Sequence, residues 1–426
     1  MTPYALLRRH RDYRLVLAAG LASLMGDWVL HIGLSYLVYD LTGSTLASGA
    51  TLFAGFAPQM LLGSVAGVLV DRWDRRRTMV RCDLLQAVGL LPLLLVGHGR
   101  VWIVYAVALW QGCVEQFFTP ASKALVPALV PPDDLLAANA LSGQNQNVAR
   151  LVGSSLGGVL AAWGGLVGIA LFDAATFVVS ASLVALVRVS ARPDVAAPAA
   201  GRAVRRLVAE WRDGMALIRS SRALRTVLVF ALVTSTGEGI MGTLFAPWVR
   251  DVVHGDGRAY GAIMAVQAVG GIAGGLVAAS WGGRASPRAL FGWGAVVFGV
   301  LDTVLFAYPV VWPHVAPAFV LMVVLGLPGA VAMAAGMTVV QTLAEDRYRG
   351  RVLGALGAVQ GVAVVVGIGL ASWLGEVVGI LPVIVYQGVG YVIGGFVVLV
   401  GLGRTSPVAS HQSHATSSAS GGSASR

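Results

Sequence analysis

Charged residues are scarce in this sequence. Asp, Glu, Lys and Arg make up 12% of its 426 residues, whereas 57% are hydrophobic and the mean hydropathy is +0.77. Soluble globular domains carry about 25% charged residues, so this composition excludes that class. Lysine occurs once, at position 123, and the remaining positive charge is arginine.

Cysteine and catalytic motifs are also nearly absent. Cys82 and Cys113 provide neither a disulfide framework nor the spacing of a metal site. The sequence has no HExxH motif and no P-loop, and so supports neither metal chemistry nor ATP hydrolysis. The letters from Gly153 to Gly157 fit G-x-S-x-G, but a nucleophile elbow needs a strand-to-helix turn with Asp and His partners. We therefore expect no enzyme, no metal and no cofactor.

Long apolar runs fill most of the chain. Because a helix of roughly 20 residues crosses the hydrocarbon core, these runs predict an all-α membrane protein with twelve transmembrane helices. The expected spans are about 15–39, 46–70, 79–97, 101–122, 138–162, 166–187, 224–249, 259–281, 289–308, 314–342, 352–374 and 379–403.

The positions of the basic residues predict the topology. If the N-terminus is cytoplasmic, 27 of the 30 basic residues fall on the cytoplasmic side, and only Arg100, Arg250 and Arg258 fall outside. An even number of spans with both termini inside fits this distribution. The net charge of +10 then reflects topology, and no nucleic acid partner is expected. No signal peptide is recognisable, so the first span would direct insertion.

A change of composition divides the chain. We expect an N-terminal six-helix bundle at 1–188, a cytoplasmic linker at 189–222, a C-terminal six-helix bundle at 223–404 and a disordered tail at 405–426. In the linker, apolar residues recur at helical spacing between arginines: Val204, Leu207, Val208, Trp211, Met215 and Ile218. This pattern predicts an amphipathic helix that either lies on the anionic inner leaflet or is solvated.

The two halves repeat each other at a displacement of 211 residues. Gly26-Asp27 matches Gly237-Glu238, and Asp40 matches Asp251. With the same displacement Gly63 falls on Gly274 and Arg77 on Arg288, but Asp71 falls on Gly282. The second copy has therefore lost that acid.

A short hairpin between the second and third spans has the sequence GSVAGVLVDRWDRRRTMVR, from Gly63 to Arg81. Gly63 and Gly67 have the spacing at which helices approach closely in lipid. After them come Asp71 and five arginines, and the arginines hold the hairpin on the cytoplasmic side: Arg72, Arg75, Arg76, Arg77 and Arg81.

Twelve spans, a basic linker, two related halves and this hairpin together resemble the major facilitator superfamily, although Asp74 replaces the usual glycine. The segment from Ala121 to Gly158 is similar to the branch that includes enterobactin-type siderophore exporters and macrolide efflux proteins. The resemblance implies two bundles around a central cavity that rock to expose it to each side in turn. It also implies that Asp71 lies at the N-terminal end of span eleven, and that the arginines tie helices and lipid headgroups together at an inner gate. The alternative is that the hairpin only sets topology.

Acids within the spans are candidates for function, since a carboxylate at mid-depth costs about 2.5 to 3.5 kcal/mol. Asp27 lies near the middle of span one, and His31 one turn later occupies the same face, so the two could form a titratable pair. Glu238 holds the matching position in span seven, and Glu115 with Gln111 forms another polar face in span four. A proton and a cationic substrate could compete for such acids. The alternative for Asp27 is a hydrogen-bonded acid that only joins helices.

Other polar and small residues have weaker claims. We expect Asp83, Asp173 and Asp302 near span ends, where water or an arginine satisfies them. At the start of span five lie Gln144, Asn147 and Arg150, which could bond to gate helices, touch substrate or be structural. The group Gly153, Gly157 and Gly158 resembles the glycine-rich antiporter motif of exporters, but Ser154 replaces its proline, which leaves helix packing as the interpretation.

These observations favour a secondary transporter of the inner cell membrane that exports amphipathic small molecules, of the drug or siderophore class, in exchange for protons. Its expected partners are a small-molecule substrate, protons and membrane lipid, and we expect a monomer. Export as the direction comes from the resemblance. The alternatives are a proton-coupled uptake symporter and a non-transporting receptor or scaffold with the same fold.

Overall fold

The computed structural model describes residues 3–70, 72–97, 99–131, 134–189, 200–281, 285–344 and 348–402. The elements in these ranges are all helical. They are α1 (Pro3–Arg9), α2 (Arg11–Thr42), α3 (Thr45–Val70), α4 (Arg75–Leu90), η1 (Leu91–Leu95), α5 (Trp102–Leu129), α6 (Leu135–Ala185), α7 (Ala200–Ser220), α8 (Arg222–Pro247), η3 (Trp248–Val252), α9 (Gly257–Trp281), α10 (Pro287–Ala307), η4 (Tyr308–Val310), α11 (Ala316–Leu343), α12 (Arg349–Val377), α13 (Ile380–Ile384) and α14 (Tyr386–Gly401).

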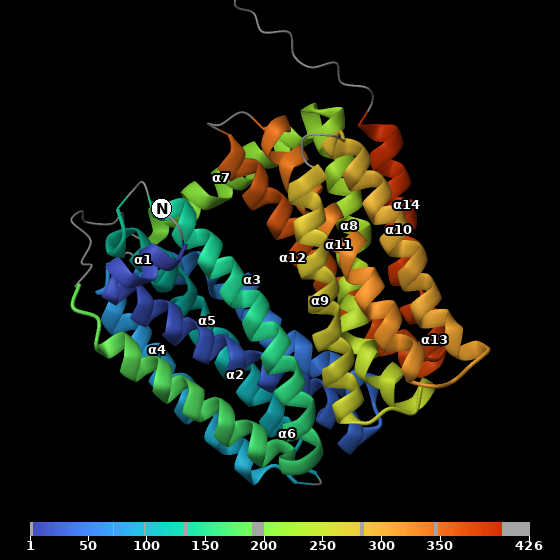
Figure 1. Cartoon of the computed structure of the whole chain (residues 1–426), viewed down its shortest axis with the longest axis horizontal. Coiled ribbons are helices and arrows are strands. Elements are labelled where there is room, and N and C mark those ends of the chain that lie inside the picture. The colour runs from blue at the N-terminus through green and yellow to red at the C-terminus, as the bar shows by residue number, and fades with distance from the viewer. Residues whose placement is uncertain are drawn as a thin grey trace, which may run out of the picture.

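The helices form two lobes, which Figure 1 shows side by side. Helices α1 to α6 make up the N-terminal lobe, α8 to α14 make up the C-terminal lobe, and α7 bridges them. The lobes meet at one end, which we call the joined end. They diverge toward the other, the open end, where the N-terminus and α7 lie (Figure 1). Each lobe has its own apolar core, around Phe177 and Ile169 in the first and around Trp248 and Phe306 in the second.

Ten helical segments in the described ranges are long and apolar enough to cross a membrane. Two differences separate this number from the twelve expected spans. Helix α5 is not among the ten, and the expected fifth and sixth spans form one segment within the 51-residue helix α6. That helix is interrupted at Gly165, whose φ of 54° and ψ of −153° are not helical. Glycine tolerates this backbone because it has no Cβ.

Short polar side chains start several helices. Asp74 accepts a hydrogen bond from the backbone N–H of Arg77 at 2.8 Å and so caps α4, while Ser221 and Ser286 cap α8 and α10 in the same way. Asp74, which replaces the family's usual glycine, thus stabilises the start of α4.

The linker helix α7 packs against the C-terminal lobe along part of its apolar face. Met215 and Ile218 are buried in the C-terminal lobe, and a Cβ at Gly214 would clash with the backbone of Arg351 at the start of α12. Asp213 forms an ion pair with Arg351 at 3.1 Å. The expectation that this helix lies on lipid or is merely solvated is therefore wrong for its C-terminal half, because α12 covers that part. Trp211 stays exposed, and the tail at 405–426 lies outside the described residues.

Candidate functional site

Asp27 lies on α2, with its side chain half-buried. Within the described ranges its carboxyl has no hydrogen bond and no ion pair. The charged groups that interact with it electrostatically are other acids: Asp83, Glu115 and Asp173. His31 forms no ion pair with Asp27 in these ranges. Its exposed ring instead packs edge-on against Trp28, with centroids 5.9 Å apart. The sequence pattern placed the two residues on one face, but the structure leaves the acid unpaired.

Glu115 lies on α5 and accepts a hydrogen bond from the hydroxyl of Thr119. Gln111, one turn earlier, donates to the backbone oxygen of Gln86 on α4 at 3.0 Å. Gln111 therefore links α5 to α4, whereas Glu115 bonds within α5, and both side chains are half-buried.

The prediction that Asp83, Asp173 and Asp302 lie near wet span ends is wrong. Asp83 and Asp173 are 0% exposed, and Asp302 is 2% exposed. Ser180 on α6 donates to Asp83 at 2.8 Å, and Thr176 donates to Asp173 at 3.1 Å. The apolar residues around these acids close over them, which the distance from a span end along the sequence could not reveal.

Glu238, the repeat equivalent of Asp27, lies on α8 with an exposed side chain. Tyr391 on α14 donates its hydroxyl to the Glu238 carboxylate at 2.6 Å, and Gln387 donates its amide at 3.5 Å. The C-terminal lobe thus holds its acid with two donors.

Arg150 on α6 reaches across to the other lobe. Its guanidinium donates to the side-chain oxygen of Gln267 on α9 and lies 5.7 Å from the ring centroid of Trp28. Arg150 is also within electrostatic range of Glu238. One cation therefore connects the polar sites of the two lobes. Gln144 and Asn147, which precede it on α6, have exposed side chains.

The small residues of α6 allow two close helix contacts. A Cβ at Gly153 would lie 2.6 Å from the Met25 backbone oxygen on α2, and Gly157 packs against the same helix. A Cβ at Gly158 would lie 2.5 Å from the Gly257 oxygen and 3.0 Å from the Cα of Gly261 on α9. Gly158 therefore lies where the two lobes cross backbone to backbone, which agrees with the packing interpretation.

Polar contacts hold the lobes together at the joined end. Arg250 forms an ion pair with Asp40 at 3.2 Å, and Tyr39 donates to Asp251. Thr45 on α3 donates to the backbone oxygen of Ser372 on α12 at 3.0 Å. Ser44 donates to Glu376 of α12 at 2.7 Å. Asp40 and Asp251, which correspond in the repeat, thus both form bonds at this interface.

At the open end, the hairpin arginines bond within the N-terminal lobe. Arg75 donates to the Ala124 backbone oxygen on α5 at 2.9 Å, and Arg76 donates to that of Ala185 at the end of α6. Trp73 stacks on Phe117 with ring centroids 5.9 Å apart. Arg72, Arg77 and Arg81 are exposed. The backbones of Gly63 and Gly67 belong to α3, whereas Asp71 lies outside the described residues.

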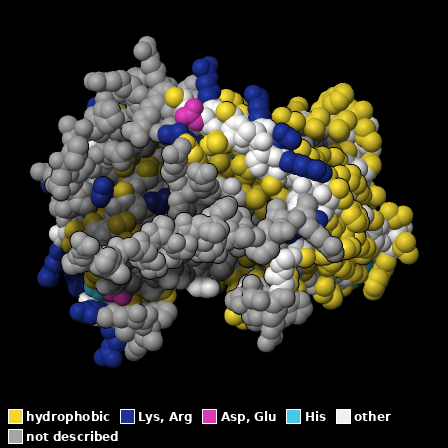
Figure 2. Space-filling view, turned by 90° about the horizontal axis from the view of Figure 1, so that it is seen from above, with side chains coloured by type: hydrophobic (Ala, Val, Ile, Leu, Met, Phe, Trp, Pro, Cys, Tyr) yellow, Lys and Arg dark blue, Asp and Glu magenta, His cyan; other side chains and the backbone are white. Residues whose placement is uncertain are grey.

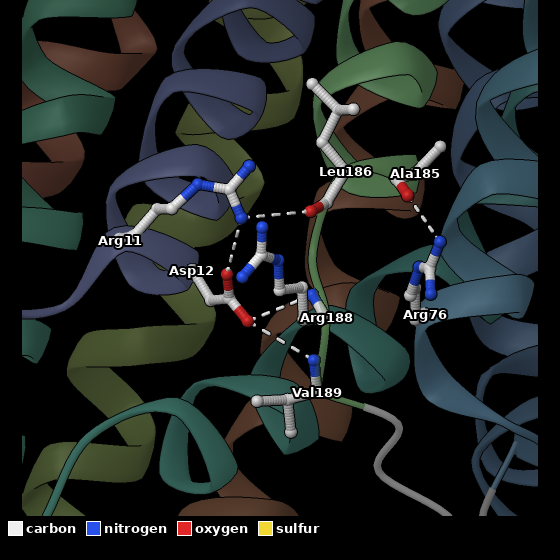
Figure 3. A network of polar contacts seen from close by, with 7 residues as sticks. All are labelled: Arg11, Asp12, Arg76, Ala185, Leu186, Arg188 and Val189. Atoms are coloured by element: carbon white, nitrogen blue, oxygen red, sulfur yellow. Dashed lines mark hydrogen bonds and ion pairs between the residues drawn. The ribbon is translucent and has the colours of Figure 1, made fainter.

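The C-terminal end of α6 is held from two helices, as Figure 3 shows. Besides Arg76, Arg11 on α2 donates to the Leu186 oxygen at 3.4 Å. Asp12 accepts from the backbone N–H groups of Arg188 and Val189 at 2.9 and 3.2 Å. Arg288 on α10 makes a similar bond to the Leu399 oxygen of α14. Each lobe thus secures its last helix with an arginine, although Arg288 corresponds in the repeat to Arg77 and not to Arg76.

Basic side chains gather at the open end. Figure 2 views this face, where coloured Lys and Arg side chains outnumber the acids. Exposed arginines of α1, the hairpin and α7 include Arg8, Arg9, Arg77, Arg212 and Arg219. Membrane proteins concentrate such residues on the cytoplasmic side.

Two helical lobes that meet across a polar interface are the architecture of the major facilitator fold. Solved structures share this fold. A bacterial homologue of the iron transporter ferroportin, in an inward-facing state, superposes with a TM-score of 0.75 at 15% identity, over 92% of this chain and 99% of that one. A bacterial homologue of the lysosomal transporter Spinster gives 0.66 at 13% identity, over 92% and 95%.

Residues 1–416 match the model of a family described as transmembrane secretion effectors, and the chain belongs to that family. It is 24% identical to macrolide efflux protein A of Streptococcus pyogenes, over 84% of this chain and 88% of that protein. It is 25% identical to the multidrug efflux pump Tap of Mycolicibacterium fortuitum, over 86% and 90%. An enterobactin exporter of Salmonella choleraesuis is 26% identical over 94% of each chain. The protein is thus a multi-pass transporter of the cell membrane and not an enzyme.

Sequence reasoning missed several polar residues of the site. Tyr391, Gln387 and Gln267 contact the candidate residues, and each interrupts an otherwise apolar helix. A polar residue within an apolar helix was therefore the signal in the sequence that could have identified them. Their partners could not be assigned, because hydropathy does not tell which neighbouring helix a side chain faces.

Proposed function

We propose that this protein exports amphipathic small organic molecules, of the drug or siderophore class, in exchange for protons by alternating access. The observation that carries the proposal is Asp27, a partly exposed carboxyl at membrane depth with no hydrogen bond or ion pair among the described residues. An acid in low dielectric that lacks a fixed partner is suited to exchange a proton, or to bind a cation in its place.

The efflux relatives support export as the direction and bulky organic molecules as the cargo. These relatives handle macrolides, several drugs and enterobactin, as their names state. In our proposal the aromatic side chains near Asp27, the half-buried Trp28 and the exposed His31, contact the apolar part of the substrate. The acids would bind the proton that drives its release.

We further propose twelve spans, with α6 counted as two across Gly165 and α5 as one, and both termini in the cytoplasm. The cluster of arginines at the open end supports this orientation. The described conformation would then be open to the cytoplasm, with the joined end outside. We expect the monomer to be the working unit, because each chain supplies both lobes.

The hairpin would act as the inner gate. Arg75 and Arg76 fix it to α5 and α6, so that Asp71 can meet the N-terminal end of α12 when the open end closes. We expect Asp71→Ala to slow transport several-fold, because it removes a contact made in only one of the two gate states. Thiol labelling of the inner cavity would report the shift, and labelling equal to that of the parent would contradict the role.

The test of the proposed function is a flux measurement in proteoliposomes. The purified full-length chain is reconstituted, a pH gradient is imposed, and a panel of fluorescent dyes, macrolides and siderophores is followed together with internal pH. We expect substrate to move against its gradient while protons move down theirs. Movement of both in the same direction would indicate a symporter, and the absence of any flux across the panel would reject transport of these classes.

A further inference from the structure

Asp302 is a buried acid that the proposed mechanism does not use. It lies on α10 and is 2% exposed, and its Oδ2 atom has no hydrogen-bond partner in the described part of the chain. The groups that interact with it electrostatically are Glu238 and Tyr391, neither of which is a cation. A carboxylate without a counter-charge at this depth is expensive, by several kcal/mol.

A second unsatisfied atom lies on the neighbouring helix. Gln387 on α14 is 3% exposed; its amide nitrogen donates to Glu238, while its Oε1 atom has no partner in the described ranges. Helices α10 and α14 touch backbone to backbone at this level, since a Cβ at Gly299 would lie 2.5 Å from the Gly388 oxygen. Asp302 follows Gly299 by one turn, Gln387 precedes Gly388, and both residues interact with Glu238, so the two residues flank this helix contact.

A single proton would satisfy both atoms. Unpartnered buried acceptors cost about 1 to 3 kcal/mol each. If the Asp302 carboxyl is protonated, its O–H can donate to the Oε1 of Gln387, which removes both unsatisfied acceptors and the buried charge together.

The surroundings contain little that would oppose this arrangement. The elements packed against α10 carry few titratable groups: α14 has Tyr386 and Tyr391, η4 has Tyr308, and α11 and α13 have none. On α10 itself the other charged residue is Arg288, at its opposite end, where it bonds to α14. From α8, Glu238 faces the site.

The N-terminal lobe has a related arrangement, although not at the positions that correspond in the repeat. Asp83 on α4 is 0% exposed and its Oδ1 has no partner in the described chain; the same is true of the Oε1 of Gln86 one turn later. Gln86 lies near Glu115, as Gln387 lies near Glu238. Each lobe therefore has a buried Asp and a buried Gln near a second acid that is more accessible.

We propose that Asp302 is a proton-binding site, and that its neutral carboxyl donates to Gln387 and thereby positions the amide toward Glu238. Asp302 is a positioning residue in this arrangement, and Glu238 is the group that meets the space between the lobes. The occupancy of the site does not depend on the proposed export. Only its use, as a pH-sensitive support for Glu238 during transport, depends on that function.

The direct test is infrared spectroscopy of the purified full-length protein in lipid nanodiscs. We expect the parent to show the carbonyl stretch of a protonated carboxyl that exchanges slowly with deuterium, and Asp302→Asn to lose it. The matched control is Asp213→Asn, which removes an exposed acid of α7 and should leave the band unchanged. An Asp302→Asn spectrum identical to that of the parent would overturn the proposal.

A second variant keeps the test informative if Asp302→Asn does not fold. Gln387→Met removes the acceptor, so the same band should move to higher frequency; an unmoved band would contradict the hydrogen bond. In the flux assay, Asp302→Asn should retain export at alkaline pH where the parent loses it, since the amide cannot ionise. A lack of export by the parent would reject the proposed function but leave the infrared result intact.

Discussion

Asp27 and Glu238 hold matching positions in the two lobes, but their surroundings differ. Asp27 has no hydrogen bond or ion pair in the described ranges, whereas Glu238 accepts from Tyr391 and Gln387. Glu238 also lies within range of a cation, Arg150, while the neighbours of Asp27 are acids. The repeat has kept both carboxyls, but only the first is free to change partners.

The helix packing beside the two acids is more alike. A Cβ at Gly26 would collide with Asp173 and Thr176 on α6, and a Cβ at Gly237 would lie 3.1 Å from the Cα of Gln387 on α14. Thr176 and Gln387 are themselves 211 residues apart, the displacement found in the sequence. Each lobe therefore brings its first helix against its last through a glycine, and the difference lies in the donors that the last helix supplies.

The largest effect should come from Asp27→Asn. An amide cannot take up a proton, so we expect proton-driven export to fall about tenfold or more, with protein abundance and ligand binding near those of the parent. The measurement is dye efflux from proteoliposomes across an imposed pH gradient. Export equal to that of the parent would remove Asp27 from the mechanism.

Glu238→Gln should have a smaller effect and so test the comparison itself. The glutamine oxygen can still accept from Tyr391, and we expect export to fall about threefold, since a hydrogen bond to a charged group contributes about 1.5 to 3 kcal/mol and only part of that is lost. The same flux assay applies. If Glu238→Gln were as damaging as Asp27→Asn, the two acids would be equivalent in use despite their different partners.

At the joined end, Gly261→Ala should favour separation of the lobes. Its Cβ would clash with the backbone oxygen of Ser154, and overpacking of this kind costs about 1 to 3 kcal/mol, enough to shift a two-state population about tenfold. A thiol at the buried position 372, introduced as Ser372→Cys, would become more reactive. Gly271→Ala on the same helix is the control, because nothing lies within 4 Å of its Cβ, and it should not change the labelling.

The smallest effect is expected at the hairpin. Arg76→Ala removes the bond to the end of α6, and we expect a loss of about 1 kcal/mol in stability, seen as a lower thermal unfolding temperature in detergent. Arg77→Ala, one residue along, removes an exposed arginine and should leave that temperature unchanged. Equal shifts in the two variants would mean that the bond contributes nothing beyond surface charge.

Much of the architecture could be predicted from the sequence, because apolar runs and arginine positions directly reflect the bilayer. Mid-span acids such as Asp27 and Glu238 stand out for the same reason. Depth was misjudged at Asp302 and Asp83, where distance from a span end was taken as exposure although neighbouring helices cover both side chains. Arg150 shows a further limit, since its bond to Gln267 joins residues 117 positions apart in different lobes. The docking of Met215 and Ile218 on α12 was likewise hidden, because an amphipathic stripe does not specify what covers it.

The crossing of Gly158 over Gly261 also bears on how freely the halves can move. If the lobes move as we propose, they can separate and rejoin at this point without rearranging side-chain rotamers, because no side chains interleave there. The tilt between the lobes would then be limited by the polar contacts at the joined end, such as Arg250 with Asp40, and not by the packing at Gly158.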